Sequence, residues 1–444
     1  MIPSHTKLSR HPNRSTHRGV IANPKAAPNL EPIFRSPRAS PRSRGSVQLW
    51  RARVACGYAN NLGTYLNTVL HSNRTQETYN YNFGIEYEAP HGIILSVGYV
   101  GSRGLFNVMS AVDLNQLDLG TIQKYGASLC VNTSDPSCVM VPNVWEPTQP
   151  PTNANYGLST VPLWVSLQEF PQFGNGSYDP GNGYNAGIQV HSWPGADSEY
   201  SSLQTRVQKR LTNHFTTLAS FTWAKLITDN DLPTLGFIGS HSGRAQDWKD
   251  LKYEHAVSAQ DVKYQFTWQA SYDLPVGKGR ELNLGGPANA ILGGWTANGI
   301  FYVSTGVPVA GPIVGANISY FDQRANMVCD AGKGAPHTAT QWFKPDCFAN
   351  PASPFVPGTA PVYLDHVRTM GADNLDLSFY KNFPFGKERN LRFEVSSYNV
   401  ANKAQLGYPN VPSYTSGWSN NAFGQITQTV NTPRQFQFGS RFTF

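Results

Sequence analysis

The chain has 444 residues, of which 40% are hydrophobic and only 14% are charged, and it contains 40 glycines and 32 prolines. Soluble domains carry about 25% charged residues, so this composition excludes a helical bundle, a coiled coil and a long acidic tail. It also excludes a membrane-spanning helix, because the sequence contains no apolar run of about 18 residues. A transmembrane β-barrel stays compatible, because barrel strands alternate and never form long apolar runs.

The net charge of +7 comes from the start of the chain. Residues 1–75 hold 12 basic residues and one acid, Glu31, whereas residues 76–444 hold 23 basic and 27 acidic residues. The first 45 residues have no hydrophobic period, and no apolar run long enough for a signal peptide. A basic segment can bind nucleic acid, but this composition favours an unfolded chain. We predict that 1–75 is disordered or not native to the protein, and that nucleic acid is not a partner.

The first strand pattern begins at Thr78. Aromatic and aliphatic side chains from Tyr79 to Tyr87 alternate with polar ones, which is typical of a strand with one apolar and one polar face. A tight turn is predicted at 89–92, and a second strand follows through Leu95 and Tyr99.

The same alternation recurs along the chain. It predicts seven further strands, at 200–211, 215–225, 263–274, from 295 onward, around 375–379, around 391–395 and at 435–444. Nine strands are therefore expected in all.

The predicted connections alternate in length. Four are short (89–92, 212–214, 275–294 and 384–390), and four are long (105–199, 226–261, 306–372 and 401–433). Long loops count against a compact soluble domain, but an outer-membrane barrel has short turns at one end and long external loops at the other. We predict an all-β, antiparallel transmembrane barrel with lipid on its apolar face and a wet lumen on its polar face. A soluble sandwich or propeller is the alternative, since periodicity alone does not separate the two.

Nine segments carry a family resemblance. They are GYVGSRG (98–104), LQTRVQKRL (203–211), ASFTWAK (219–225), YDLPVGKGR (272–280), ILGGW (291–295), NLDLS (374–378), KNF (381–383), FGQI (423–426) and PRQFQFG (433–439). With them, residues 76–444 resemble the C-terminal barrel of Oar-like TonB-dependent outer-membrane receptors of the acidobacterial type.

The resemblance implies a barrel of about 22 strands in the bacterial outer membrane. An N-terminal plug closes the lumen, and TonB energises the uptake of a bulky nutrient. The sequence holds no plug, TonB box or signal peptide, so we expect the C-terminal part of a larger barrel, which depends on TonB only through a missing plug. The implied partners are outer-membrane lipid, the barrel assembly machinery and a bulky ligand such as an oligosaccharide or a peptide. The assembly machinery would read the terminal aromatics Phe436, Phe438, Phe442 and Phe444.

The strand count adds a topological expectation. If the C-terminus lies in the periplasm, every short link falls on the periplasmic side and every long link outside. Nine strands do not satisfy the even number of a bacterial single-chain barrel. We therefore expect earlier strands to be missing, and the strands at 78–88 and 434–444 to be left as open edges or forced into strained pairing.

One long loop gathers groups that could do chemistry. It holds Asp229, Asp231, His241, Asp247, Asp250, Glu254, His255 and Asp261, which could ligate a metal or transfer protons, and Ser240 and Ser242 flank His241. The spacing matches no zinc signature, and no phosphate-binding glycine motif occurs. We expect no catalytic residue, metal or cofactor, and no enzyme.

The cysteines form two close pairs. Cys130 and Cys138 lie in one long loop and Cys329 and Cys347 in another, while Cys56 is left over. We predict the disulfides Cys130–Cys138 and Cys329–Cys347, because disulfides persist at cell surfaces. Four free thiols are the alternative.

Three functions stay open at this point. The leading one is a receptor and transporter for a bulky ligand. The others are a surface adhesion protein that uses the long loops alone, and a soluble secreted carbohydrate-binding protein. Loop aromatics that could stack on a ligand are Trp145, Tyr156, Trp164, Tyr178 and Trp193.

Overall fold

The chain divides into two units, residues 1–54 and 55–444, and the described residues all belong to the second. The computed structural model describes residues 66–69, 74–109, 112–130, 135–144, 157–171, 178–179, 183–184, 188–191, 193–212, 214–231, 245–316, 322–352, 356–385, 388–411 and 422–444. The predicted segment 1–75 lies almost entirely outside them.

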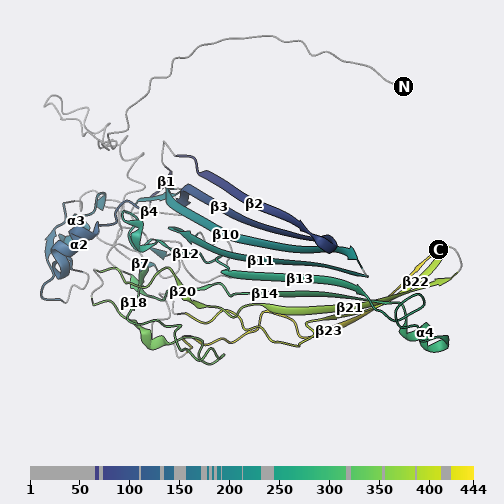
Figure 1. Cartoon of the computed structure of the whole chain (residues 1–444). Coiled ribbons are helices and arrows are strands. Elements are labelled where there is room, and N and C mark those ends of the chain that lie inside the picture. Colours follow the sequence, from purple (N-terminus) through teal and green to yellow (C-terminus); the bar gives the residue numbers. More distant parts are fainter. Residues whose placement is uncertain are drawn as a thin grey trace, which may run out of the picture. The chain divides into compact units, whose positions relative to one another are not determined.

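A large antiparallel sheet forms the body of this unit (Figure 1). Its strands follow chain order, each beside the next: β2 (Glu77–Ala89), β3 (Ile93–Met109), β10 (Trp193–Thr212), β11 (Phe215–Thr228), β13 (Tyr264–Asp273), β14 (Trp295–Ser304), β21 (Asp373–Phe385), β22 (Arg389–Tyr398) and β23 (Gln435–Thr443). The short β12 (Ala256–Val257) pairs with β11 beside this path. The nine predicted strands and the all-β antiparallel class are confirmed.

Two strands are longer than the sequence analysis predicted. β3 continues to Met109 and β10 begins at Trp193, so the first long connection covers 110–192 rather than 105–199. Their pairing persists because register shifts near Ala196 absorb the irregular segment around Pro194.

The strand register separates two faces across the whole sheet. Along one row Phe83 faces Tyr99, Tyr99 faces Leu203, Leu203 faces Trp223 and Trp223 faces Tyr264. Many of these side chains are exposed, and Phe83 keeps 71% of its surface uncovered. An apolar surface of this extent is not normal for a water-exposed sheet, and it fits lipid.

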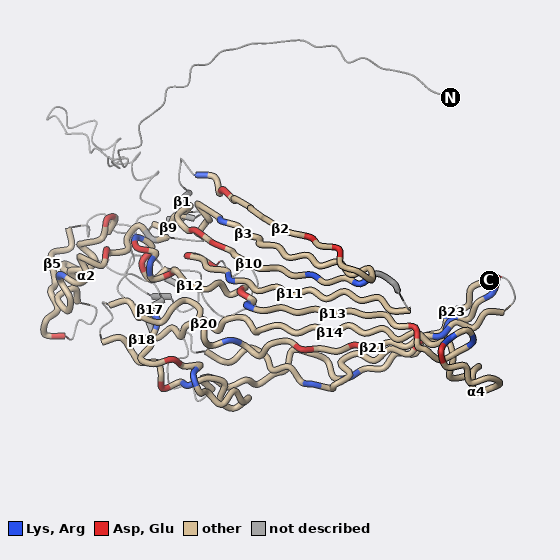
Figure 2. Tube along the Cα trace, viewed as in Figure 1, with Lys and Arg blue, Asp and Glu red and all other residues tan. Residues whose placement is uncertain are grey.

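The neighbouring row is polar. It runs from Gly84 through Gly98 and Gln204 to Thr222 and Gln265. Figure 2 shows few charges in the middle of the sheet: β14 has none, and β13 has only Asp273 at its end. The alternation predicted from sequence is therefore kept over all nine strands.

The edge strands β2 and β23 each have one partner among the described residues. Because the nine strands alternate in direction, β2 and β23 run the same way, so pairing them directly would make a parallel pair. The open edges expected from the strand count are present in this sheet.

The four long connections lie at one end of the sheet (Figure 1). We call their described residues within 110–192, 229–263, 305–372 and 399–434 the loop layer. Its elements are β4 (Val112–Asp113), α2 (Leu119–Tyr125), η3 (Gly126–Leu129), β5 (Met140–Pro142), β6 (Thr160–Pro162), α3 (Leu163–Ser166), β7 (Tyr178–Asp179), β8 (Gly183–Tyr184), β9 (Ile188–His191), η6 (Leu251–Tyr253), β15 (Pro308–Ala310), β16 (Ile313–Ala316), β17 (Asp322–Arg324), β18 (Asn326–Met327), η7 (Pro345–Cys347), β19 (Phe348–Ala349) and β20 (Tyr363–Arg368). A further strand, β1 (Leu66–Val69), pairs with β9.

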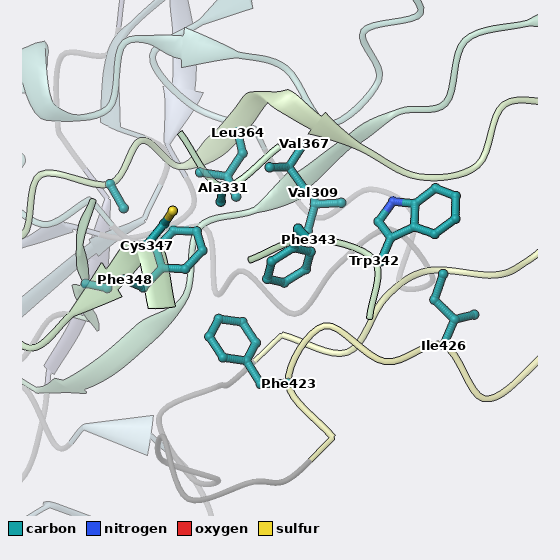
Figure 3. Close-up of a cluster of buried hydrophobic side chains, with 12 residues drawn as sticks. Val309, Ala331, Trp342, Phe343, Cys347, Phe348, Leu364, Val367, Phe423 and Ile426 are labelled. Atoms are coloured by element: carbon teal, nitrogen blue, oxygen red, sulfur yellow. The ribbon is translucent and has the colours of Figure 1, made fainter. Parts of the chain in front are cut away.

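The buried apolar core lies mostly in this loop layer. Its largest cluster joins the third connection to the fourth: Phe343 packs edge-on against Phe423 at 5.2 Å between ring centres, and Trp342 and Ile426 lie beside them (Figure 3). The long connections therefore fold on one another.

The opposite end of the sheet carries η2 (Pro90–Gly92), the connection with α4 (Gly286–Leu292), and the short links from β10 to β11 and from β21 to β22, whose residues are described only in part. No described helix is long and apolar enough to cross a membrane.

Candidate functional site: the polar face and the loop layer

A hollow of about 450 Å³ lies in the polar face. Gly84 and Gly98, which pair between β2 and β3, line it, and the position of a Cβ at Gly84 would meet only backbone atoms at 3.6 Å or more. Glu86, Gln204 and Arg206 line the hollow. Such a wall offers hydrogen bonds and charge of both signs to a polar partner.

The loop layer is organised around one buried ion pair. Arg324 is 0% exposed and Glu254 is 3% exposed. The Arg324 guanidinium donates to both Glu254 carboxylate oxygens, at 2.9 and 3.1 Å, and to the carbonyls of Tyr253 and Ala360. A bidentate Arg–carboxylate pair is among the strongest hydrogen-bonded contacts, and the carbonyls satisfy further N–H groups.

Gln246 extends this pair into a network. Its backbone N–H donates to Glu254 at 2.8 Å, and its side-chain oxygen accepts from the backbone N–H groups of Arg324 and Gly358. Gln116 donates to the Gln246 carbonyl at 2.7 Å. A Cβ at Gly358 would lie 1.8 Å from the Arg324 carbonyl oxygen, so only glycine fits there. Three long connections, from 110–192, 229–263 and 305–372, are therefore joined by one buried polar network.

A second junction ties the loop layer to the strand ends. Arg368 on β20 donates to Asp261 at 2.6 Å and to Asp365 at 2.8 Å, and Lys225 on β11 contacts Asp365 at 3.2 Å. Asp261 also accepts from the backbone N–H of Leu226 at 2.6 Å. These contacts fix 305–372 over the end of β11.

The acids of the cluster predicted in 226–261 each take part in a separate contact. Asp229 pairs with His255 at 2.7 Å, and Asp231 accepts from Ser258 and from the backbone N–H of Ala259. Burial raises the pKa of the Asp231 carboxyl. In the part of the chain that the structure describes, no three His, Cys, Asp or Glu side chains converge as a metal site. Ser240, His241 and Ser242 lie outside the described residues.

The two remaining acids of the cluster bond locally. Asp247 accepts from the backbone N–H of Lys249 at 2.9 Å, and Asp250 pairs with the exposed Lys252. These two acids thus stabilise their own connection.

The loop aromatics proposed as ligand contacts are used in packing where they are described. Trp193 packs against Trp248 at 5.1 Å, and Trp164 packs against the cluster of Leu117, Ile122 and Leu129. Trp145, Tyr156 and the side chain of Tyr178 lie outside the described residues.

The structure brings together both predicted cysteine pairs. Cys130 and Cys138 are joined with their Cα atoms 4.2 Å apart, and Cys329 and Cys347 with theirs 4.8 Å apart. Cys347 lies in the cluster of Figure 3, so its bridge ties 327–330 to that core.

We predict that all four cysteines are oxidised in the mature protein, each bridge adding roughly 2–3 kcal/mol through loop closure. Alkylation of the unreduced protein should label Cys56 alone, and reduction should expose four more thiols. Peptide mapping that finds Cys130 or Cys329 alkylated without reduction would contradict the prediction.

The terminal aromatics form a row at the sheet edge. Phe436, Phe438 and Phe442 on β23 face Ser397, Val395 and Leu391 of β22. Phe442 and Phe444 stack with ring centres 6.1 Å apart. All four phenylalanines are exposed, as expected of side chains that meet a partner outside the chain.

The sequence analysis missed Arg324, Gln246 and Gln116. They lie in connections without periodicity, and they meet across separations of 78 and 130 residues. The sequence gives only a general signal for them. Few residues of the chain are charged, so a buried charge in it would be unusual.

A family model described as outer membrane beta barrel domain matches residues 15–437 of the chain. The match begins inside the basic segment 1–75 and ends in β23. No curated protein sequence matches the chain.

Several solved structures are similar at low identity. The ferripyoverdine receptor FpvA of Pseudomonas aeruginosa bound to heterologous pyoverdine is 12% identical, with a TM-score of 0.34, over 83% of this chain and 27% of that one. The Escherichia coli outer membrane transporter YddB is 9% identical, with a TM-score of 0.41, over 86% and 35%. The ferric citrate transporter FecA in its unliganded form is 10% identical, with a TM-score of 0.31, over 82% and 31%. The chain thus spans about a third of these proteins.

Proposed function

The chain belongs to the outer membrane β-barrel domain family, and on this premise we propose that it forms part of the wall of a TonB-dependent receptor that takes up a bulky ligand. The protein is located in the outer membrane. The reading as a soluble carbohydrate-binding protein is set aside by that location. We propose a receptor rather than an enzyme.

The observation that carries the proposal is the two-faced sheet. Over nine strands an aromatic and aliphatic face lies opposite a polar face that contains the hollow at Gly84 and Gly98. A polar face of this width suits the water-filled or plugged lumen of a large barrel. The segments listed above for the TonB-dependent resemblance support the finer assignment.

The proposed orientation follows from the connections. Barrels of this class have short periplasmic turns and long external loops, so the loop layer is external and α4 is periplasmic. We propose that an odd number of further strands, outside the described residues, completes the barrel, because only then do β2 and β23 both gain antiparallel partners.

A surface adhesion protein is the second candidate function. The packed loop layer favours it in one respect, since loops joined by a buried network present a fixed surface to a partner. An adhesion protein needs no plug, and this difference separates the two functions.

Neighbouring residues of β13 offer a direct test. Gln269 belongs to the polar face and Trp268 to the apolar face, and both are exposed. A photocrosslinking amino acid at Gln269 in the native cell is expected to capture a polypeptide that carries a plug domain. The same group at Trp268, the matched control, should capture lipid. Crosslinking to no polypeptide at Gln269, with normal insertion of the protein, would favour the adhesion protein and overturn the receptor.

A further inference from the structure

The connection between β13 and β14 folds onto the apolar side of the sheet. Trp295, Lys381 and Phe393 face one another along a single apolar row. From this row the Trp295 indole donates to the Ile291 carbonyl at 2.9 Å, and the Lys381 ammonium donates to the carbonyls of Ala290 and Ile291. These bonds hold the end of α4 beside the lipid-facing surface rather than beside the lumen.

The connection between β13 and β14 is ordered by backbone hydrogen bonds. The Gly277 N–H donates to the Leu282 carbonyl at 2.9 Å, the Leu282 N–H donates to the Pro275 carbonyl at 2.8 Å, and Gly294 donates to the Val276 carbonyl at 2.8 Å. Arg280 donates to Asp273 at 3.1 Å, which fixes the start of the connection to the end of β13. The positions of its side chains therefore follow from a defined backbone.

This connection exposes four large aliphatic side chains. Leu282, Leu284, Ile291 and Leu292 keep 55%, 51%, 68% and 57% of their surfaces uncovered, and α4 buries no residue. Such a group on a short turn is unusual in water. It adjoins the apolar row at Trp295, so it continues the surface that faces lipid.

We propose that α4 and its flanking leucines form an interfacial anchor that inserts into the phospholipid surface at the short-turn end of the barrel. Apolar segments of this kind sink about 5–10 Å, to the boundary between headgroups and acyl chains. Trp295 and the stem of Lys381 lie at the same level, which suits residues with an apolar body and a polar tip. The assignment to the periplasmic leaflet rests on the proposed orientation, whereas the contact with lipid does not.

The test uses a complete receptor that contains this chain, with Cys56 replaced by serine, inserted into vesicles of phosphatidylethanolamine and phosphatidylglycerol. An environment-sensitive fluorophore is attached at Ile291→Cys. The matched control is Lys278→Cys, an exposed polar position of the same connection, and Phe438→Cys on β23 is the lipid-facing reference. Heat-modifiable gel mobility identifies the inserted protein in each sample.

We expect blue-shifted emission at position 291 that lipids brominated on their acyl chains quench several-fold more strongly than at position 278. Water-like emission at 291 in inserted protein would overturn the anchor. Blue-shifted emission without quenching by brominated lipid would also overturn it, because the side chain would then be covered by protein. Failure of insertion at all positions would count against the membrane barrel itself.

Discussion

Replacing Arg324 by methionine is expected to destabilise the loop layer by about 3–5 kcal/mol, because it leaves a buried carboxylate without its partner. Glu254 is nearly inaccessible and accepts from the guanidinium at two oxygens. The carbonyls of Tyr253 and Ala360 also lose their donors. These groups belong to two connections, and Gln246, which donates to Glu254, links them to Gln116 in a third. We therefore expect amides in 112–130, 245–263 and 322–364 to lose protection from hydrogen exchange together.

Two comparisons make this prediction specific. The double variant Arg324→Met with Glu254→Leu removes both charges, and it should recover much of the lost protection because no buried charge stays unpaired. Lys252→Met removes an exposed partner of Asp250 in the same connection, and it should leave exchange unchanged. Loss of protection confined to 322–364 in Arg324→Met would contradict the idea that one network joins the three connections.

The strands could be predicted because their signal is local. In β2 the alternation from Tyr79 to Tyr87 indicates which side chains share a face. The register pairs them with residues on one face of β3. The alternation of short and long connections was equally visible. β3 and β10 were underestimated because Gly104, Pro194 and Gly195 interrupt the alternation while the pairing continues around them.

The loop layer could not be predicted because its contacts are distant in sequence. Arg324 and Glu254 are 70 residues apart, and neither belongs to a periodic segment. Local reading only showed that Asp229, Asp231, Glu254 and Asp261 lie close together in one connection, where they could ligate a metal or transfer protons, and it expected no metal there. The structure divides them among His255, Ser258, Arg324 and Arg368, so each acid stabilises a separate contact.

The position of α4 could be predicted less well than the strands but better than the loop layer. The apolar residues around Ile291 were visible in the sequence, but their direction depends on Lys381, which is 90 residues away. Only the register of β14 against β21 shows that Trp295 and Lys381 share the apolar face. Sequence periodicity can thus define a face, but not which connection folds back onto it.

Deletion of Phe444 is expected to block barrel assembly while leaving export intact, when the chain is part of a complete receptor with an export signal. β23 is an edge strand, and Phe444 keeps 91% of its surface exposed, so the deletion removes few contacts within the fold. An open strand edge and a row of exposed aromatics are available to a partner that adds a strand to the sheet edge, as we propose for the assembly machinery. The measurement compares surface-exposed with periplasmic protein, by protease accessibility of the loop layer in whole cells.

Phe438→Ala supplies the matched control for the loss of Phe444. It removes an aromatic of the same strand and face, where Phe438 meets Val395, but it keeps the chain end. If the terminal residue is the recognised signal, the deletion should abolish surface protein and Phe438→Ala should reduce it only in part. If the aromatics act only through burial in lipid, which contributes about 25 cal/mol per Å², the two variants should lower surface levels to similar, graded extents. Normal surface levels after deletion of Phe444 would remove the assembly role from this residue, and β23 would then be an ordinary lipid-facing strand.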